Sequence, residues 1–215
     1  MEEPVVTTQG STVEEWTRAL AESTGSPGGG AGTGLMLAVA ASLTSMVAGY
    51  SGDDGGEPAR IRARAHALRQ EALRLADDDA SASKAFGAAF RLEPGQEREE
   101  AIRSASLEAA ASSALLGERA IGAIDDLGWL ATNGNRSLVA DVVVAFGALR
   151  AAVAGARTNV SFDLGSLRSA GATLDQVREQ HPDLWAAVEK LNGAMERIDE
   201  LTAAIDHRAA PTDAV

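Results

Sequence analysis

Residues 26–50 read SPGGGAGTGLMLAVAASLTSMVAGY, in which three consecutive glycines lead directly into a long apolar segment. The segment is rich in alanine and contains no charged residue, which indicates a buried α-helix that begins at the glycines. Its strongly apolar part, residues 35–50, is shorter than the roughly 20 residues that span a bilayer. Two aspartates rather than basic residues follow it. We therefore expect a central helix of a bundle, and no membrane partner.

The remaining sequence predicts further helices of similar length. No Asn-Gly or Asp-Gly pair lies between two segments of alternating polarity, and apolar residues recur at helical spacing. The helices are expected from residue 11, from the glycines to about residue 48, and over 58–92, 97–130, 137–162 and 183–207. Short connections between them favour an all-α, up-and-down bundle of about six helices. Residues 1–215 then form one domain, with a core over about 11–207 and a frayed tail over 208–215.

The first predicted helix has a capping signal of its own. Ser11 is followed three residues later by Glu14, the spacing of a capping box. Helical periodicity then predicts that Val13, Trp16 and Leu20 are buried.

Composition limits the classes of partner. The chain of 215 residues has 31 acidic and 19 basic side chains, a formal charge of −12, which disfavours nucleic acid and anionic lipid. It has no cysteine, which excludes disulfides and thiolate metal sites and agrees with a cytoplasmic location. The three histidines, His66, His181 and His207, lack partners at metal-ligand spacing, so we expect neither a metal nor another cofactor.

Glycines occur at two places where another group could approach the backbone closely. Gly28, Gly29 and Gly30 do not form a phosphate loop, because no Gly-Lys-Ser/Thr follows and no strand precedes them. Two interpretations stay open: a helix N-terminus that receives an anion or a carbonyl oxygen, or a joint where two backbones pack closely. In the TNGN turn, Gly134 is predicted to adopt a left-handed conformation.

One carboxylate falls on the apolar stripe of the third predicted helix. The stripe alternates steps of four and three from Ile61 through Leu75, and Asp79 continues it. A carboxylate on a buried face is costly unless it is paired or hydrogen-bonded. Asp79 therefore either forms a hydrogen bond to another helix that fixes how the two helices align, or acts as a catalytic acid or base.

The helix predicted over 137–162 has a face of small side chains. Asp141 and Asn159 lie near its ends, with Ala145, Ala148 and Ala152 between them. The two polar residues are 18 positions apart, about 27 Å along a helix, so one straight helix cannot bring them together. Antiparallel packing of this helix against its two-fold mate would do so. The pattern predicts a homodimer with two composite sites.

Several of these stretches together resemble one enzyme family. They are PGGG (27–30), LADDDASASKAFGAAFRL (75–92), NGNRSLVAD (133–141) and RTNVSFDL (157–164), in this order. The combination resembles the cyclodeaminase/cyclohydrolase family, folate enzymes related to the C-terminal half of formiminotransferase-cyclodeaminase. The resemblance covers about residues 13–167.

The resemblance implies an all-helical dimer with a folate site near the subunit interface. It implies chemistry at the carbon that bridges N5 and N10 of tetrahydrofolate, either hydrolysis of the methenyl ring or closure of a formimino group with loss of ammonia. Asp79 and Asp141 would be catalytic. The substrate-binding residues would be Pro27, Gly28, Gly29, Gly30, Gly134, Asn135, Asn159 and Asp163.

The chain departs from the family pattern at several polar positions. Ala31 and Ala140 stand where the family usually has serine, Ser83 where it commonly has an aromatic residue, and Asp163 where its motif has asparagine. Two alternatives therefore stay open. The scaffold acts on a cyclic C–N bond of a non-folate molecule, or it is a helical interaction module without catalysis.

Overall fold

The computed structural model describes residues 6–22, 26–52, 55–169 and 173–209, and every regular element among them is helical. The predicted all-α class is therefore confirmed. The α-helices are α1 (Val13–Ala21), α2 (Gly29–Gly49), α3 (Glu57–Phe90), α4 (Gln96–Gly122), α5 (Ile124–Asn133), α6 (Val139–Ser169), α7 (Leu174–Gln180) and α8 (Pro182–Ala209). A short 3₁₀ helix, η1 (Arg136–Leu138), precedes α6.

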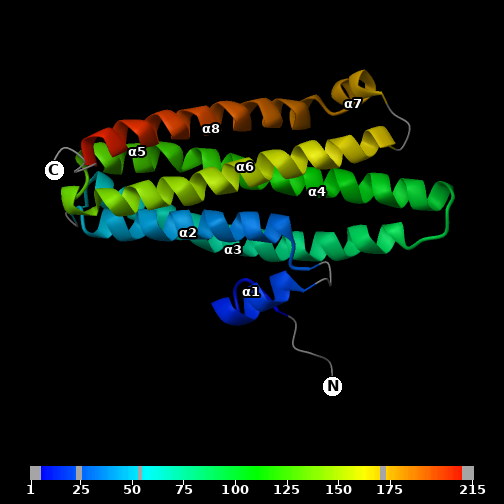
Figure 1. Cartoon of the computed structure of the whole chain (residues 1–215), viewed down its shortest axis with the longest axis horizontal. Helices are drawn as coiled ribbons and strands as arrows, with labels where there is room; N and C mark the ends of the chain where they lie inside the picture. Colours follow the sequence, from blue (N-terminus) through cyan, green and yellow to red (C-terminus); the bar gives the residue numbers. More distant parts are fainter. Residues whose placement is uncertain (1–5, 23–25, 53–54, 170–172, 210–215) are drawn as a thin grey trace, which may run out of the picture.

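The five long helices lie side by side along one axis, and α1 packs outside them (Figure 1). Helix α6 holds a central place, because it packs against α2, α4, α5 and α8. Its buried residues include Phe146, Leu149 and Val153, none of which reaches solvent. Helix α2 fills the other half of the core and packs most extensively against α3 and α6.

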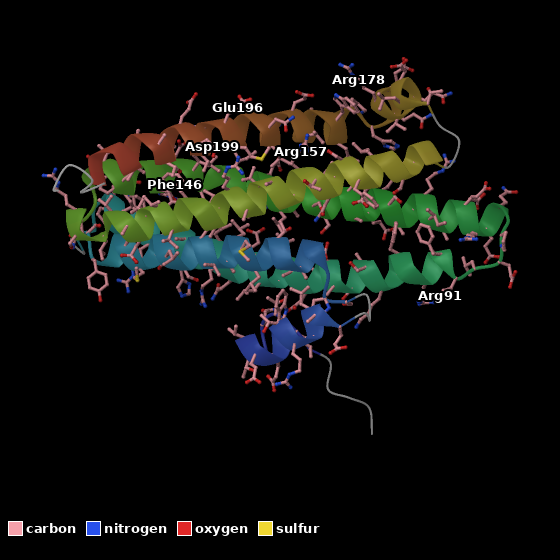
Figure 2. All side chains as sticks on the ribbon, viewed as in Figure 1. Arg91, Phe146, Arg157, Arg178, Glu196 and Asp199 are labelled. Carbon is pink, nitrogen blue, oxygen red and sulfur yellow. The ribbon has the colours of Figure 1, made fainter. Side chains whose placement is uncertain are left out.

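Side-chain hydrogen bonds tie α6 to α8 above this core. The Arg157 guanidinium donates to the Asn192 amide oxygen at 3.0 Å, and Arg150 donates to both carboxylate oxygens of Asp199. Figure 2 labels Arg157 and Asp199 of these links, with Phe146 in the core.

Several predicted boundaries are wrong. The helix expected over 97–130 is two helices, because the chain turns at Ala123, whose N–H bonds back to the Ala120 carbonyl before α5 begins. Helix α6 continues to Ser169 instead of ending near residue 162, and α7 was not predicted. Residues 210–215 of the predicted tail lie outside the described residues.

The start of α1 is displaced by one residue from its prediction. Thr12 is the N-cap, and Thr12 and Glu15 form the capping box that was assigned to Ser11 and Glu14. Trp16 is buried as expected, whereas Val13 is 78% exposed and Leu20 is also exposed. Only one turn of α1 faces the bundle, so the short helix buries one large side chain rather than three.

The small-residue face of α6 packs within its own chain. Ala145, Ala152 and Ala156 are fully buried, and a Cβ on Gly155 would overlap the side chain of Thr33 on α2. The prediction that this face forms a subunit interface is therefore wrong. Small side chains permit close helix packing inside a subunit as well as between subunits, and α2 occupies the space.

Two helices are long and apolar enough to cross a membrane by length and composition, α2 and the segment over residues 136–167. Both are also core helices of the bundle, with 56% and 33% of the apolar window buried inside the chain. The lower value reflects an apolar face of α6 that points away from the bundle.

Candidate active site

A cavity of about 320 Å³ opens where the first turn of α2 meets α3, α4 and α6. Glycines of α2 form one wall, and aromatic rings of α3 and α6 flank the opening. Polar side chains from three helices complete the lining, namely Asp79, Ser83, Ser113, Asn159 and Asp163.

The glycines let Asp79 approach the start of α2. The N-cap of α2 is Gly28, which has no side chain to accept a hydrogen bond from the first turn. The Asp79 carboxylate on α3 fills this role, because the backbone N–H of Ala31 donates to it. A Cβ on Gly30 would overlap that carboxylate, so only glycine fits there. Of the two interpretations of the glycines, the first agrees with the structure, because the start of α2 receives an anionic group, the Asp79 carboxylate. Gly30 permits its close approach, and the neighbour is a side chain and not a second backbone.

The three adjacent aspartates of α3 have different surroundings. Asp77 accepts hydrogen bonds from Thr8 and Gln9 and so holds the segment before α1. Asp78 pairs with Arg74 one turn away on the exposed side of the helix, at 2.6 Å. Asp79 faces the cavity, as the stripe on α3 predicts.

Asp79 is in an environment that favours its protonated form. Burial raises the pKa of Asp79, and the hydrogen bonds from the Ala31 backbone and the Ser83 side chain offset this only in part. One carboxylate oxygen, Oδ2, is buried and has no hydrogen-bond partner among the described residues. A carboxyl group with a raised pKa inside a cavity is a candidate for proton transfer.

Asp163 is a second carboxylate on the same cavity. It is only 9% exposed, and burial together with the negative charge of Asp79 raises the pKa of Asp163 to about 7. Asn159, one turn earlier on α6, lines the cavity beside it. The two carboxyl groups therefore interact electrostatically, and Asp163 is about half protonated at pH 7.

We predict that Asp163→Asn stabilises the fold at pH 8 by about 4 kcal/mol, because the pKa of Asp163 is raised from 3.8 to about 7. Between about pH 4 and pH 7 the folded state holds a proton on Asp163 that the unfolded state has lost, so wild-type stability falls as the pH rises through this window. Asparagine does not ionise and avoids the loss. Urea unfolding of both proteins at pH 4.5 and pH 8 measures the effect, which should be small at the lower pH. An equal difference at both pH values would contradict the shifted pKa.

The other predicted site residues lie elsewhere in the chain. Gly134, Asn135 and Asp141 are at the opposite end of α6 from Asn159, about 27 Å away along the helix. Pro27 is buried just before α2 and does not line the cavity, and Gly28 faces Ser83. Within one chain, the structure brings together Gly29, Gly30, Asp79, Asn159 and Asp163, and no others of the set.

Gly134 and Asn135 link the end of α2 to the start of α6. Gly134 has φ −77° and ψ −173°, so the predicted left-handed conformation is wrong. Position 134 requires glycine for a steric reason, because a Cβ there would lie only 2.5 Å from the Leu130 carbonyl oxygen. The Asn135 backbone N–H donates to Ser51 Oγ at 2.9 Å, and its side-chain oxygen accepts from the Ser137 N–H and caps η1.

Sequence reasoning missed three of the residues that line the cavity. Ser113 comes from α4, and Phe86 and Phe162 are the aromatic residues at the opening. Phe86 lies on the predicted stripe of α3, which could have identified it. The pattern of α4 contains no comparable sign for Ser113, because its partners come from other helices.

Metal ligands are not clustered in the part of the chain that the structure describes, where no group of three or more His, Asp or Glu side chains could hold an ion. The cavity therefore offers carboxyl, amide and hydroxyl groups for proton transfer and hydrogen bonding.

Comparison with known proteins agrees with the architecture. A profile of the formiminotransferase-cyclodeaminase family matches residues 12–183. The crystal structure of formiminotetrahydrofolate cyclodeaminase from Thermotoga maritima superposes with a TM-score of 0.75, at 22% sequence identity over 92% of this chain and 98% of that one. No curated protein sequence matches significantly. At this identity the superposition establishes the shared helical fold.

Proposed function

Because the chain belongs to the formiminotransferase-cyclodeaminase family, we propose that it opens or closes a C–N bond at the one-carbon unit of tetrahydrofolate. The observation that carries this proposal is the pair of Asp79 and Asp163 in one cavity. The reacting carbon lies between two nitrogens, and both reactions move a proton from an attacking atom to a departing nitrogen.

Asp79 is suited to this proton transfer. In hydrolysis, water adds to the methenyl carbon and gives one proton to a carboxylate. The C–N5 bond then breaks as N5 takes up a proton, and the second proton of the water is released as the carbonyl of the 10-formyl compound forms. In cyclodeamination, N10 attacks the formimino carbon and loses its proton, and ammonia leaves after gaining one. A single carboxyl group with a raised pKa can carry the proton in either direction. Asn159 and Ser113 supply hydrogen bonds that orient the ligand.

The apolar face that α2 and α6 leave uncovered is the subunit interface in this proposal. Exposed apolar residues follow both helices, and they are Met36, Val39 and Met46 on α2 and Val144 and Phe162 on α6. Val144 is 59% exposed and Phe162 is 70% exposed, so both helices, which pack against each other, carry large apolar side chains in contact with water (Figure 1). We propose that a second copy of the chain covers this surface in the cytoplasm, rather than lipid.

A two-fold axis across this face would complete the site. If two α6 helices run antiparallel across this exposed face, Asp141 of the partner subunit would come toward the end of the cavity that carries Asn159. Gly134 and Asn135 of the partner subunit would then border the same cavity. Phe162 would lie between the interface and the opening.

The activity test uses the wild-type protein and both folate substrates. Methenyltetrahydrofolate should lose its absorbance on hydrolysis, and formiminotetrahydrofolate should release ammonia if the cyclodeaminase activity is present. Turnover of either substrate supports the proposal, and the relative rates identify the reaction. A folded protein that turns over neither substrate would refute it.

The dimer has its own test. Light scattering should give a mass of about 44 kDa, twice the 22.1 kDa of one chain. A stable monomer that is fully active would contradict both the interface and the composite site.

A further inference from the structure

The residues that line the cavity include two acidic side chains and no basic one. Of the residues that line it, only Asp79 and Asp163 are ionisable, and the first turn of α2 has no charged residue. A neutral or anionic reacting group would leave this charge uncompensated. Asp163 has nearly the same shape as the asparagine of the family motif, but it can carry a negative charge. A ligand in the cavity must balance that charge.

Both carboxylates have unused hydrogen-bonding capacity. Asp79 Oδ2 is buried and has no partner in the described part of the chain. Asp163 is nine-tenths buried and lines the same cavity. Buried carboxylates are normally paired, so the unpartnered oxygen of Asp79 beside a second acidic side chain favours a ligand that supplies positive charge.

We propose that Asp79 and Asp163 together select ligands whose reacting group is a cationic N–C–N unit, an amidinium, and that Asp163 is the specificity-determining residue; this rests on the folate activity proposed above. An amidinium is planar and spreads its charge over both nitrogens, so it can face two carboxylates at once. Protonated formimino and methenyl groups share this charge, whereas a formyl group is neutral. We therefore expect methenyl and protonated formimino ligands to bind more tightly than the neutral 10-formyl compound.

Among the charged residues near the cavity, Arg91 comes beside its wall, where one guanidinium nitrogen is 3.9 Å from the place that a Cβ on the lining Gly87 would take. Arg91 is the C-cap of α3 and is exposed to solvent, which screens its charge, and Lys84 is exposed on the same helix (Figure 2). Glu108 is exposed on α4, one residue before the lining Ala109, and Arg157 on α6 is bonded to Asn192 of α8. The pair of carboxylates thus dominates the charge that a ligand meets in the cavity.

Benzamidine and benzamide provide a test that needs no turnover. They have nearly the same shape, but benzamidine remains cationic between pH 6 and pH 8 and benzamide is neutral. By calorimetric titration of the wild-type protein, we expect benzamidine to bind at least about tenfold more tightly at pH 8. Its affinity should fall by about tenfold between pH 8 and pH 6, because the pair takes up a proton as the pH drops below the Asp163 pKa of about 7.

Two variants assign the effect to the pair. Asp163→Asn should weaken benzamidine binding and remove its dependence on pH, whereas Glu108→Gln removes a nearby exposed charge and should bind like the wild type. Equal affinity for the two probes, no binding of either, or unchanged benzamidine binding by Asp163→Asn would overturn the inference.

The outcomes separate this inference from the proposed function. Folate turnover without preference for benzamidine would leave the activity standing and refute the cation selectivity. Preference for benzamidine that depends on Asp163, without folate turnover, would support the selectivity and refute the folate substrate.

Discussion

Replacing Asp79 with asparagine is expected to lower the turnover of methenyltetrahydrofolate by about 10²- to 10⁴-fold, the usual contribution of a positioned acid or base. Asparagine has nearly the same shape, and its amide oxygen can still accept the hydrogen bond from Ala31 at the start of α2. It cannot carry a proton. It also removes the repulsion with Asp163, so the thermal midpoint should stay within a few degrees of the wild-type value.

Asp79→Ala separates catalysis from capping. Alanine removes the acceptor as well as the proton carrier, and loss of an N-cap acceptor costs about 1 kcal/mol. Both variants should be inactive, and only Asp79→Ala should be less stable in urea unfolding. An active Asp79→Asn protein would show that the acid or base is another group. An unfolded Asp79→Asn protein would show that Asp79 has mainly the structural role that its hydrogen bond to α2 allows.

The position of Asp79 could be predicted because it depends on one helix alone. The 4–3 spacing from Ile61 to Leu75 defines the inner face of α3, and Ile61 and Leu75 are indeed buried. Position 79 continues that face, whereas Asp77 and Asp78 leave it and contact Gln9 and Arg74 instead. Periodicity thus distinguished three identical neighbouring residues.

Features that depend on two helices could not be predicted in the same way. The small-residue face of α6 is compatible with packing inside a chain or between chains, and only the fold shows that Thr33 lies against Gly155. The pairing of Asp79 with Asp163 joins positions 84 residues apart, and neither helix pattern contains it. Resemblance to a family placed Asp163 near the ligand, but its raised pKa follows from burial and a neighbouring charge.

Val144→Glu is expected to convert the dimer to a monomer and to remove activity from both sites. In the proposed dimer the exposed Val144 side chain lies against the partner subunit, and two-fold symmetry introduces the carboxylate twice. Each unpaired buried polar group costs about 1–3 kcal/mol, so the dissociation constant of the dimer should rise by about 100-fold or more. Light scattering and methenyltetrahydrofolate turnover, both measured over a range of protein concentrations, should report the two losses together.

Val13→Glu is the matched control, because it introduces the same carboxylate at an exposed valine of α1, away from α2 and α6. Glutamate at the first turn of a helix also suits the helix dipole, so this variant should stay folded, dimeric and active. A Val144→Glu protein that remains dimeric would place the interface on another face. A fully active Val144→Glu monomer would show that the cavity of Asp79 and Asp163 needs no residue from a second chain. Recovery of turnover at high protein concentration, in step with the dimer fraction, is the result that only a composite site produces.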